Sequence, residues 1–179
     1  MISLQASDFE LFGLPAAFSL DRAQLDLQWK SLQREAHPDR FASEGTAAQR
    51  IAMQWSVRIN EAYNRLKDPL KRAAYLCELN GAAVNAENNT SMPPAFLMQQ
   101  MEWREALDDC KVIQVPASKI EALEKLLDEV DASQAQVLKQ MAALIDVDHN
   151  FAAAVGQVRA LMFIDKFSQE VQHQLDACS

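Results

Sequence analysis

The sequence predicts an all-α protein. Of the 179 residues only four are glycine and six are proline, while 49% are hydrophobic, which is enough to bury a core. Alanine, leucine, glutamine and glutamate are common and favour helices. In several long segments the apolar residues recur every three or four positions, as they do in amphipathic helices. Together these features argue against an all-β or a disordered chain.

A short helix and then a longer one are expected at the start of the chain. Ser7 and Glu10 have the spacing of a capping box, which opens a helix over about residues 8–12. Asp21 is placed to cap a second helix of about residues 22–36. Its predicted core stripe consists of four residues at helical spacing: Leu25, Trp29, Leu32 and Ala36.

The second helix is expected to pair with a third one over residues 46–67. The third helix carries an apolar repeat: Ile51, Trp55, Ile59, Ala62, Tyr63 and Leu66. Asp68-Pro69 ends that repeat, and a fourth helix of about residues 70–79 follows, with Gly81 as its stop. A connection of about nine residues lets the second and third helices pack as an antiparallel hairpin.

Residues 82–93 are predicted to link two domains. The segment is poor in apolar residues and rich in asparagine, and a Pro93-Pro94 pair lies at its end. Such residues disfavour helix. We therefore expect one domain over residues 1–81 and a second over residues 94–179.

Three long helices are expected in the second domain. They cover about residues 95–110, 118–145 and 151–176. Ser118 and Glu121 have the form of a capping box that opens the middle helix. Short connections between the helices predict an antiparallel three-helix bundle.

The helix over residues 95–110 has more apolar surface than one core needs. Its first stripe contains Phe96, Trp103 and Leu107. A second apolar set lies on an adjoining face beside two glutamates: Leu97, Met98, Met101, Glu102 and Glu105. Either this second set binds a partner, or the helix is buried on two sides within the bundle. The sequence pattern leaves both interpretations open.

The formal net charge of −8 lies in the second part of the chain. Residues 1–80 carry ten Lys/Arg and ten Asp/Glu, whereas residues 81–179 carry seven and fifteen. Neither part has the basic excess that nucleic acids select for. No segment has the character of a membrane span or of a secretory signal. We therefore expect a cytoplasmic protein that binds neither nucleic acid nor membrane.

The three cysteines, Cys77, Cys110 and Cys178, are far apart in the sequence. They lack the close pairing of strong metal sites and suit the reduced thiols of the cytosol. We expect them to be structural, and we expect no metal and no cofactor. The alternative is a helical metal or cluster carrier that uses them as ligands.

His37-Pro38-Asp39 is the candidate functional motif of the first domain. Proline fixes its own φ and pushes the preceding residue out of the α region, so the second helix should end near His37. The motif then lies on an exposed, bent loop of the kind that recognises a partner. A catalytic pair of His37 and Asp39 is the alternative, but residues two apart across a proline need not face each other, and the chain has no glycine-rich phosphate loop. We therefore expect binding and no enzyme activity.

Several segments along the whole chain resemble one family. They are Leu11-Phe12-Gly13-Leu14-Pro15, His37-Pro38-Asp39-Arg40-Phe41-Ala42, Ile59-Asn60-Glu61-Ala62-Tyr63, Ala95-Phe96-Leu97-Met98 and Phe163-Ile164-Asp165-Lys166. His-Pro-Asp between two matched helices is similar to the J-domain of DnaJ-type co-chaperones. The full set resembles the HscB family, the J-proteins of iron–sulfur cluster assembly. The resemblance implies an N-terminal J-domain followed by a C-terminal three-helix domain that binds a scaffold protein.

The resemblance also implies partners and site residues. In that family the J-domain docks on a DnaK-type chaperone, HscA, and stimulates its ATPase, and the second domain delivers the scaffold protein IscU, which aids iron–sulfur cluster transfer and the maturation of iron–sulfur proteins. The implied chaperone-binding residues are Arg22, Lys30, Arg34, His37, Pro38, Asp39 and Arg40. The implied scaffold-binding residues are Leu97, Met98, Met101, Glu102, Glu105 and Phe163. The N-terminal cysteine zinc module of some eukaryotic relatives is missing from the sequence, which implies a bacterial-type member.

The chain departs from the usual J-domain in the second helix. J-domains usually have a clearly basic second helix, whereas Asp26 and Glu35 here offset Arg22, Lys30 and Arg34. The basic residues are therefore interpreted either as a solvated face or as a docking surface. A J-domain co-chaperone that serves other clients remains the nearest alternative function.

Overall fold

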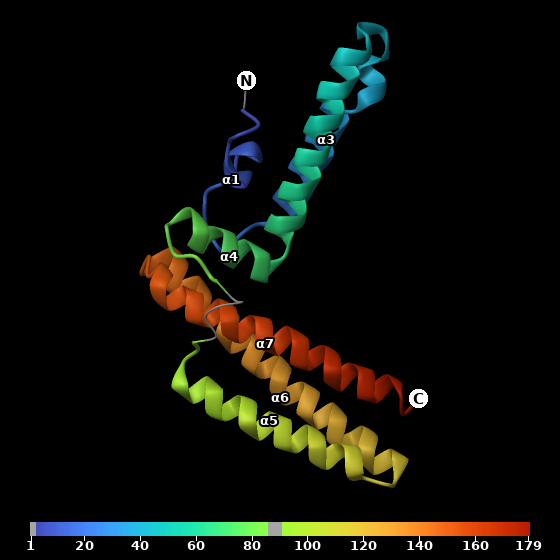
Figure 1. Cartoon of the computed structure of the whole chain (residues 1–179), viewed down its shortest axis with the longest axis vertical. Helices are drawn as coiled ribbons and strands as arrows, with labels where there is room; N and C mark the ends of the chain where they lie inside the picture. Colours follow the sequence, from blue (N-terminus) through green and yellow to red (C-terminus); the bar gives the residue numbers. More distant parts are fainter. Residues whose placement is uncertain (1–2, 86–90) are drawn as a thin grey trace. The chain divides into compact units, whose positions relative to one another are not determined.

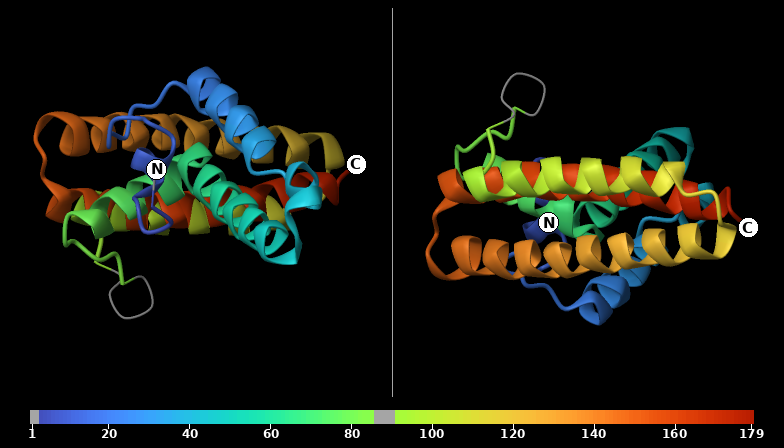
Figure 2. Two further views of the ribbon diagram at one scale, coloured as in Figure 1. Left: turned by 90° about the horizontal axis from the view of Figure 1, so that it is seen from above. Right: turned by 90° about the horizontal axis from the view of Figure 1, so that it is seen from below.

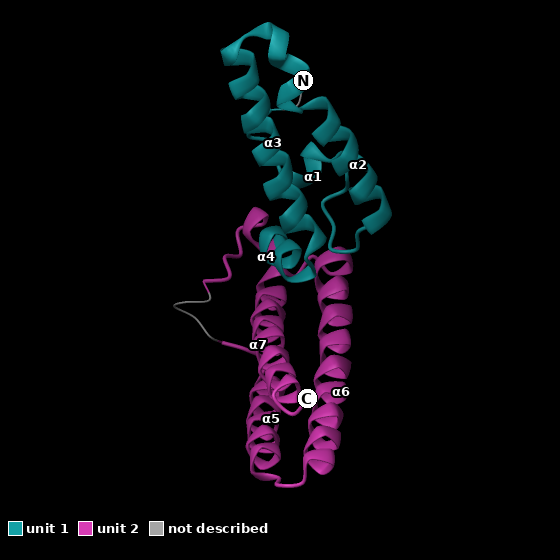
Figure 3. Ribbon diagram, turned by 90° about the vertical axis from the view of Figure 1, so that its right-hand side faces the viewer, with its two compact units in different colours: residues 1–76 teal, residues 77–179 magenta. Residues whose placement is uncertain are grey.

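The computed structural model describes residues 3–85 and 91–179. Within these residues every regular element is a helix, so the all-α prediction is confirmed (Figure 1). The chain divides into two compact units, residues 1–76 and 77–179 (Figure 3).

The first unit is a helical hairpin with a short helix beside it. Its elements are α1 (Asp8–Leu11), α2 (Arg22–Glu35), the 3₁₀ helix η1 (Pro38–Glu44), α3 (Thr46–Lys67) and the first part of α4 (Pro69–Leu79). The expected loop between the paired helices is thus largely a 3₁₀ helix. All four α-helices lie within one or two residues of their predicted ends.

Local capping explains why the first two helices start where they do. The backbone N–H of Glu10 donates to Ser7 Oγ at 3.2 Å, and the N–H of Ser7 donates to Glu10 Oε2 at 2.8 Å. Asp21 accepts from the N–H groups of Ala23 and Gln24. Both predicted caps are therefore confirmed, and they fix α1 and the start of α2 without help from distant residues.

The buried core of the first unit covers less of the hairpin than the predicted apolar stripes of α2 and α3. Leu25, Ile59 and Leu66 are buried, as predicted. Five further predicted core residues are only half-buried, namely Trp29, Leu32, Ala36, Trp55 and Tyr63, and Ile51 is 55% exposed. The prediction that Ile51 belongs to the core is wrong. The four-residue helix α1 packs on α3 but is too short to cover the hairpin as far as its tip.

A buried carboxylate ties α1 to α3. Asp8 is fully buried, and its two oxygens lie 2.8 Å from Arg58 Nη1 and 3.3 Å from Arg65 Nη1. The backbone N–H of Asp8 donates to the Tyr75 hydroxyl at 2.9 Å. A buried carboxylate needs such partners, because the desolvation of an unpaired charge is costly. This arrangement was not predicted from the sequence.

The second unit is the antiparallel three-helix bundle that the sequence predicts. It contains the end of α4, then α5 (Pro94–Val112), α6 (Pro116–Ala142), the π-helical turn η2 (Ala143–Val147) and α7 (Phe151–Asp176). Two views show α5, α6 and α7 side by side along their lengths (Figures 1 and 2). Large apolar side chains fill the interior: Trp103, Leu107, Leu123, Met141, Leu161 and Phe167.

The predicted capping box at Ser118 is wrong. Helix α6 begins two residues earlier, at Pro116, and its N-cap residue Val115 offers no side-chain hydrogen bond. Proline is well suited to the first helical position, because its φ is already helical and its missing N–H would have no partner there. Ser118 therefore lies inside the first turn.

A buried arginine holds part of the expected linker against α7. The guanidinium of Arg159 donates to the Val84 carbonyl at 2.8 Å and 3.2 Å, and to the Ser91 carbonyl at 3.1 Å. Residues 86–90 of the predicted linker lie outside the described residues. The boundary of the two units falls at Leu76, within α4, and the predicted domain limits at residues 81 and 94 stay a prediction.

Candidate functional site

The His37-Pro38-Asp39 motif forms a capped turn at the end of α2. His37 has an extended backbone (φ −64°, ψ 127°), as expected before proline, and Pro38 occupies the first position of η1. The imidazole Nδ1 of His37 accepts from the N–H of Asp39 at 3.3 Å, and the His37 carbonyl accepts from Arg40 N–H at 3.0 Å. We call residues 37–40 the docking loop.

The docking loop presents a carboxylate to solvent. The Asp39 side chain is 91% exposed, and one of its oxygens lies 3.6 Å from His37 Nδ1. Since Nδ1 accepts the Asp39 N–H, a neutral imidazole carries its proton on Nε2, so His37 acts here as a helix cap. The arrangement fixes the backbone that carries Asp39 and leaves the carboxylate oxygens open to a partner.

The four basic residues implied in chaperone binding have different surroundings. Lys30 and Arg34 are exposed. Arg40 turns back towards α2, where Nη1 lies 3.4 Å from the Arg34 carbonyl. Arg22 is the most engaged, since Nε lies 2.8 Å from Asp26 Oδ1. Lys30 and Arg34 are thus better placed than Arg22 to meet an acidic partner.

An aromatic and cationic cluster joins α2 to α3. The Trp29 and Tyr63 rings stack at 4.7 Å, and the cations of Arg22 and Lys67 lie 5.7 Å and 5.2 Å from the Tyr63 ring. Asp26 and the Tyr63 hydroxyl raise the pKa of Arg22, and Arg22 is the main cause that lowers the pKa of Asp26.

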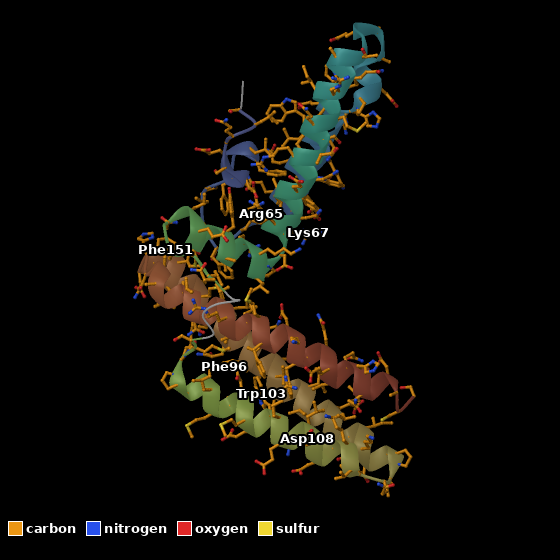
Figure 4. All side chains as sticks on the ribbon, in the orientation of Figure 1. Arg65, Lys67, Phe96, Trp103, Asp108 and Phe151 are labelled. Atoms are coloured by element: carbon orange, nitrogen blue, oxygen red, sulfur yellow. The ribbon has the colours of Figure 1, made fainter. Side chains whose placement is uncertain are left out.

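Sequence reasoning missed this cluster because it assigned Trp29 and Tyr63 to the core. Asn60, three residues before Tyr63, could have indicated a polar environment, and in the structure it accepts a hydrogen bond from Trp29 Nε1. Lys67 is four residues after Tyr63, on the same side of α3. The cluster adds Lys67, which Figure 4 labels on α3, to the basic residues of the hairpin.

In the second unit the second apolar set of α5 is exposed. Met98 is 66% and Met101 73% exposed, and Leu97 is 43% exposed. Glu102 and Glu105 are exposed beside them. The first stripe, including Phe96, Trp103 and Leu107, is buried in the bundle. We call Leu97, Met98, Met101, Glu102 and Glu105 the α5 face. Its exposure favours the partner-binding interpretation over a helix buried on two sides.

Phe163 borders the α5 face but is half-buried in an aromatic cluster. Its ring lies 5.9 Å from Phe96 and 5.7 Å from Phe167. The Arg104 guanidinium lies 5.4 Å from the Phe163 ring and forms an ion pair with Glu170. Arg104 is three residues after Met101, on the same side of α5, so it connects Phe163 to the face. Figure 4 shows Phe96 and Trp103 along α5.

Two of the three cysteines have the surroundings of structural residues. Cys77 and Cys110 are buried, and burial raises the pKa of the Cys77 thiol to about 11 and raises that of Cys110 as well. Raised values disfavour the thiolate that binds metals. Among the described residues no group of three or more His, Cys, Asp or Glu side chains could hold a metal ion.

Comparisons with known proteins identify the family. A family model described as the HSCB C-terminal oligomerisation domain matches residues 92–172. The co-chaperone protein HscB homolog of Burkholderia multivorans is 49% identical over 176 residues, which cover 98% of each chain. The homolog of Paraburkholderia xenovorans is equally similar, with the same coverage. The chain belongs to the HscB co-chaperone family.

Solved HscB structures share the fold. The chaperone HscB from Vibrio cholerae has a TM-score of 0.82 and 37% identity, with 97% of this chain and 100% of that chain covered. Human co-chaperone HscB has a TM-score of 0.84 at 23% identity, with 97% and 84% covered. The described helices include none that is long and apolar enough to cross a membrane. As in other HscB proteins, a J-domain is thus followed by a helical bundle.

Proposed function

We propose that the chain stimulates the ATPase of a DnaK/HscA-type chaperone and delivers an IscU-type iron–sulfur scaffold protein to it. The docking loop contacts the chaperone, and the α5 face with Phe163 holds the scaffold. The chain itself catalyses no reaction, and its location in the cytoplasm remains a prediction. The observation that carries the proposal is the exposed Asp39 carboxylate on a capped turn of an HscB-family chain.

The docking loop suits a charge-assisted contact. An arginine of the chaperone can donate to Asp39, and a hydrogen bond to a charged group contributes about 1.5–3 kcal/mol. Pro38 and the His37 cap hold the backbone, so little conformational entropy is lost on binding. Binding here favours the hydrolysis-competent chaperone conformation, which is a shift of populations and not shared chemistry.

Basic residues add long-range attraction. Lys30 and Arg34 steer an acidic chaperone surface towards the loop, and Arg22 contributes less because Asp26 already neutralises it. The negative charge of Asp26 therefore offsets mainly the charge of Arg22.

The α5 face suits a protein partner. Exposed Leu97, Met98 and Met101 supply an apolar centre, and methionine adapts well to another surface. Glu102 and Glu105 form a polar rim, an arrangement typical of protein interfaces. The half-buried Phe163, whose ring lies 5.9 Å from that of Phe96, borders this centre.

Asp39→Asn tests the docking loop. This variant keeps the shape of the side chain and removes its charge, so we expect it to fold and to lose at least about tenfold of the ATPase stimulation. Glu61→Gln, which neutralises another exposed carboxylate of the hairpin, is the matched control and should stimulate normally. A folded Asp39→Asn protein with the wild-type rate of stimulation would falsify the proposal.

Replacing Leu97, Met98 and Met101 together by alanine tests the α5 face. The scaffold should bind at least about tenfold more weakly, because apolar anchors dominate such interfaces. The control replaces three other exposed apolar residues of the second unit, Val112, Val115 and Val147, by alanine. Equal scaffold affinities of the two triple variants in calorimetry would reject the α5 face.

A further inference from the structure

An apolar groove lies near the tip of the hairpin, between α2, η1 and α3. Its volume is about 400 Å³, within the range of sites that bind ligands. Ten residues line it: Leu32, Glu35, Ala36, Phe41, Glu44, Ala48, Ile51, Ala52, Trp55 and Ile59. The end of the hairpin, where α2 and α3 are connected, is visible in Figure 3.

The groove exists because the apolar residues of α3 continue past the end of α1, so that α1 does not cover them. Buried Ala52 and Ile59 form its floor, and half-buried Trp55 and Phe41 form its walls. Ile51 is 55% exposed at its edge. Contiguous exposed apolar surface of this kind commonly marks a binding site.

The charges at the groove are acidic. Among the described residues that line it, Glu35 and Glu44 are the charged ones, and both are exposed. Lys30 and Arg34 lie about 160° around α2 from Leu32 at about 100° per residue. The groove is therefore on another side of α2 than the basic residues that face the chaperone in the proposed function.

We propose that this groove binds an apolar segment of a partner protein that also carries lysine or arginine. Apolar side chains of the segment fill the space over Ala52 and Ile59, beside Trp55. Its cations pair with Glu35 and Glu44 at the rim. This site goes beyond the proposed function, and neither the docking loop nor the α5 face contains any of its residues.

Charge complementarity disfavours a second copy of this chain as the occupant. The exposed apolar residues of the α5 face are accompanied by Glu102 and Glu105, and the whole chain carries a net charge of −8. Inserting that face into the groove would bring carboxylates next to Glu35 and Glu44. Like charges in close contact oppose association.

Peptide titration of the full-length protein tests the proposal. The probe is a short amphipathic helical peptide of leucine and lysine, and binding is followed by the indole N–H signals of the three tryptophans in NMR spectra. We expect a saturable shift of Trp55, while Trp29, which does not line the groove and whose indole N–H donates to Asn60, and buried Trp103 of the second unit stay unchanged. Peptides of leucine with glutamate, and of serine with lysine, should bind at least about tenfold more weakly.

Matched variants locate the binding. Ile51→Glu and Met53→Glu add the same charge to the same helix at residues of similar exposure, 55% and 57%, but only Ile51 lines the groove. Ile51→Glu should weaken peptide binding at least about tenfold, Glu44→Gln should weaken it less, and Met53→Glu should leave it unchanged.

Several results would overturn the proposal. Equal binding of the leucine–glutamate peptide would show an apolar site without charge selection, and equal binding of the serine–lysine peptide would show attraction by net charge alone. Equal effects of Ile51→Glu and Met53→Glu would exclude the groove. If Ile51→Glu dissociated a dimer while the peptide left Trp55 unshifted, a second copy would be the occupant. The Ile51→Glu variant is also tested for stimulation of the chaperone ATPase. A wild-type rate would show that the groove is separate from the docking loop, and a lost stimulation would contradict that separation.

Discussion

The docking loop and the α5 face are held in place by different means. The loop depends on local contacts, because His37 caps the turn that carries Asp39 and Pro38 sets its backbone. The α5 face depends on distant residues, because its helix is positioned by Phe96 and Trp103, which pack against Phe163 and Phe167 of α7. A short polar motif can therefore be recognised in the sequence. An apolar face can be assigned as a site only when the structure shows that no other helix covers it.

The largest effect is expected from truncating the core behind the α5 face. Trp103→Ala should lower the free energy of unfolding by about 3–5 kcal/mol, since Trp103 is 2% exposed and leaves a cavity. Trp29→Ala is the comparison in the first unit, where the half-exposed ring stacks on Tyr63, and it should cost clearly less. Urea unfolding of both variants measures the difference. Equal losses of unfolding free energy in the two variants would contradict the expectation that Trp103 contributes more to stability than Trp29.

A smaller effect is expected at the buried arginine of α7. Arg159→Met keeps the apolar stem but removes the donors to Val84 and Ser91, which should cost about 1–3 kcal/mol. Hydrogen exchange near residues 84 and 91 should accelerate, while Lys166→Met, an exposed change on the same helix, should leave it unaltered. Unchanged exchange in Arg159→Met would indicate that this segment is held by other contacts.

The smallest change in stability is expected in the loop itself. His37→Ala removes a side-chain cap, for which about 1 kcal/mol is typical. The Asp39 amide should exchange faster, and the midpoint of thermal unfolding should hardly move. His173→Ala, another exposed histidine, serves as the control. A large global loss in His37→Ala would contradict the local account of the loop.

Much of the fold was predictable because its signals are local. Periodicity located the long helices, and side-chain oxygens at Ser7 and Asp21 located two starts. The capping signal at Ser118 misled because Pro116 already opens that helix. Periodicity also placed Ile51 and Trp29 in the core, since it shows which face is apolar but not whether another element covers it.

The missed features join residues far apart in the chain. Asp8 pairs with Arg58 and Arg65, and Trp29 stacks on Tyr63, contacts for which no local pattern exists. The site residues of both surfaces came instead from a resemblance of short motifs to HscB proteins, which full-length identity of 49% supports. The structure adds that Arg22 is paired with Asp26 and that Phe163 is half-buried.

In the proposed function one chain must carry both the docking loop and the α5 face. The most direct measurement is the ATPase rate of a cognate chaperone with its scaffold and an equimolar mixture of two variants, Asp39→Asn and the triple alanine variant of Leu97, Met98 and Met101. Delivery needs both contacts on one chain, because only then is the second binding event intramolecular. We predict that the mixture is no faster than the triple variant alone. A mixture that restores the wild-type rate would contradict the account.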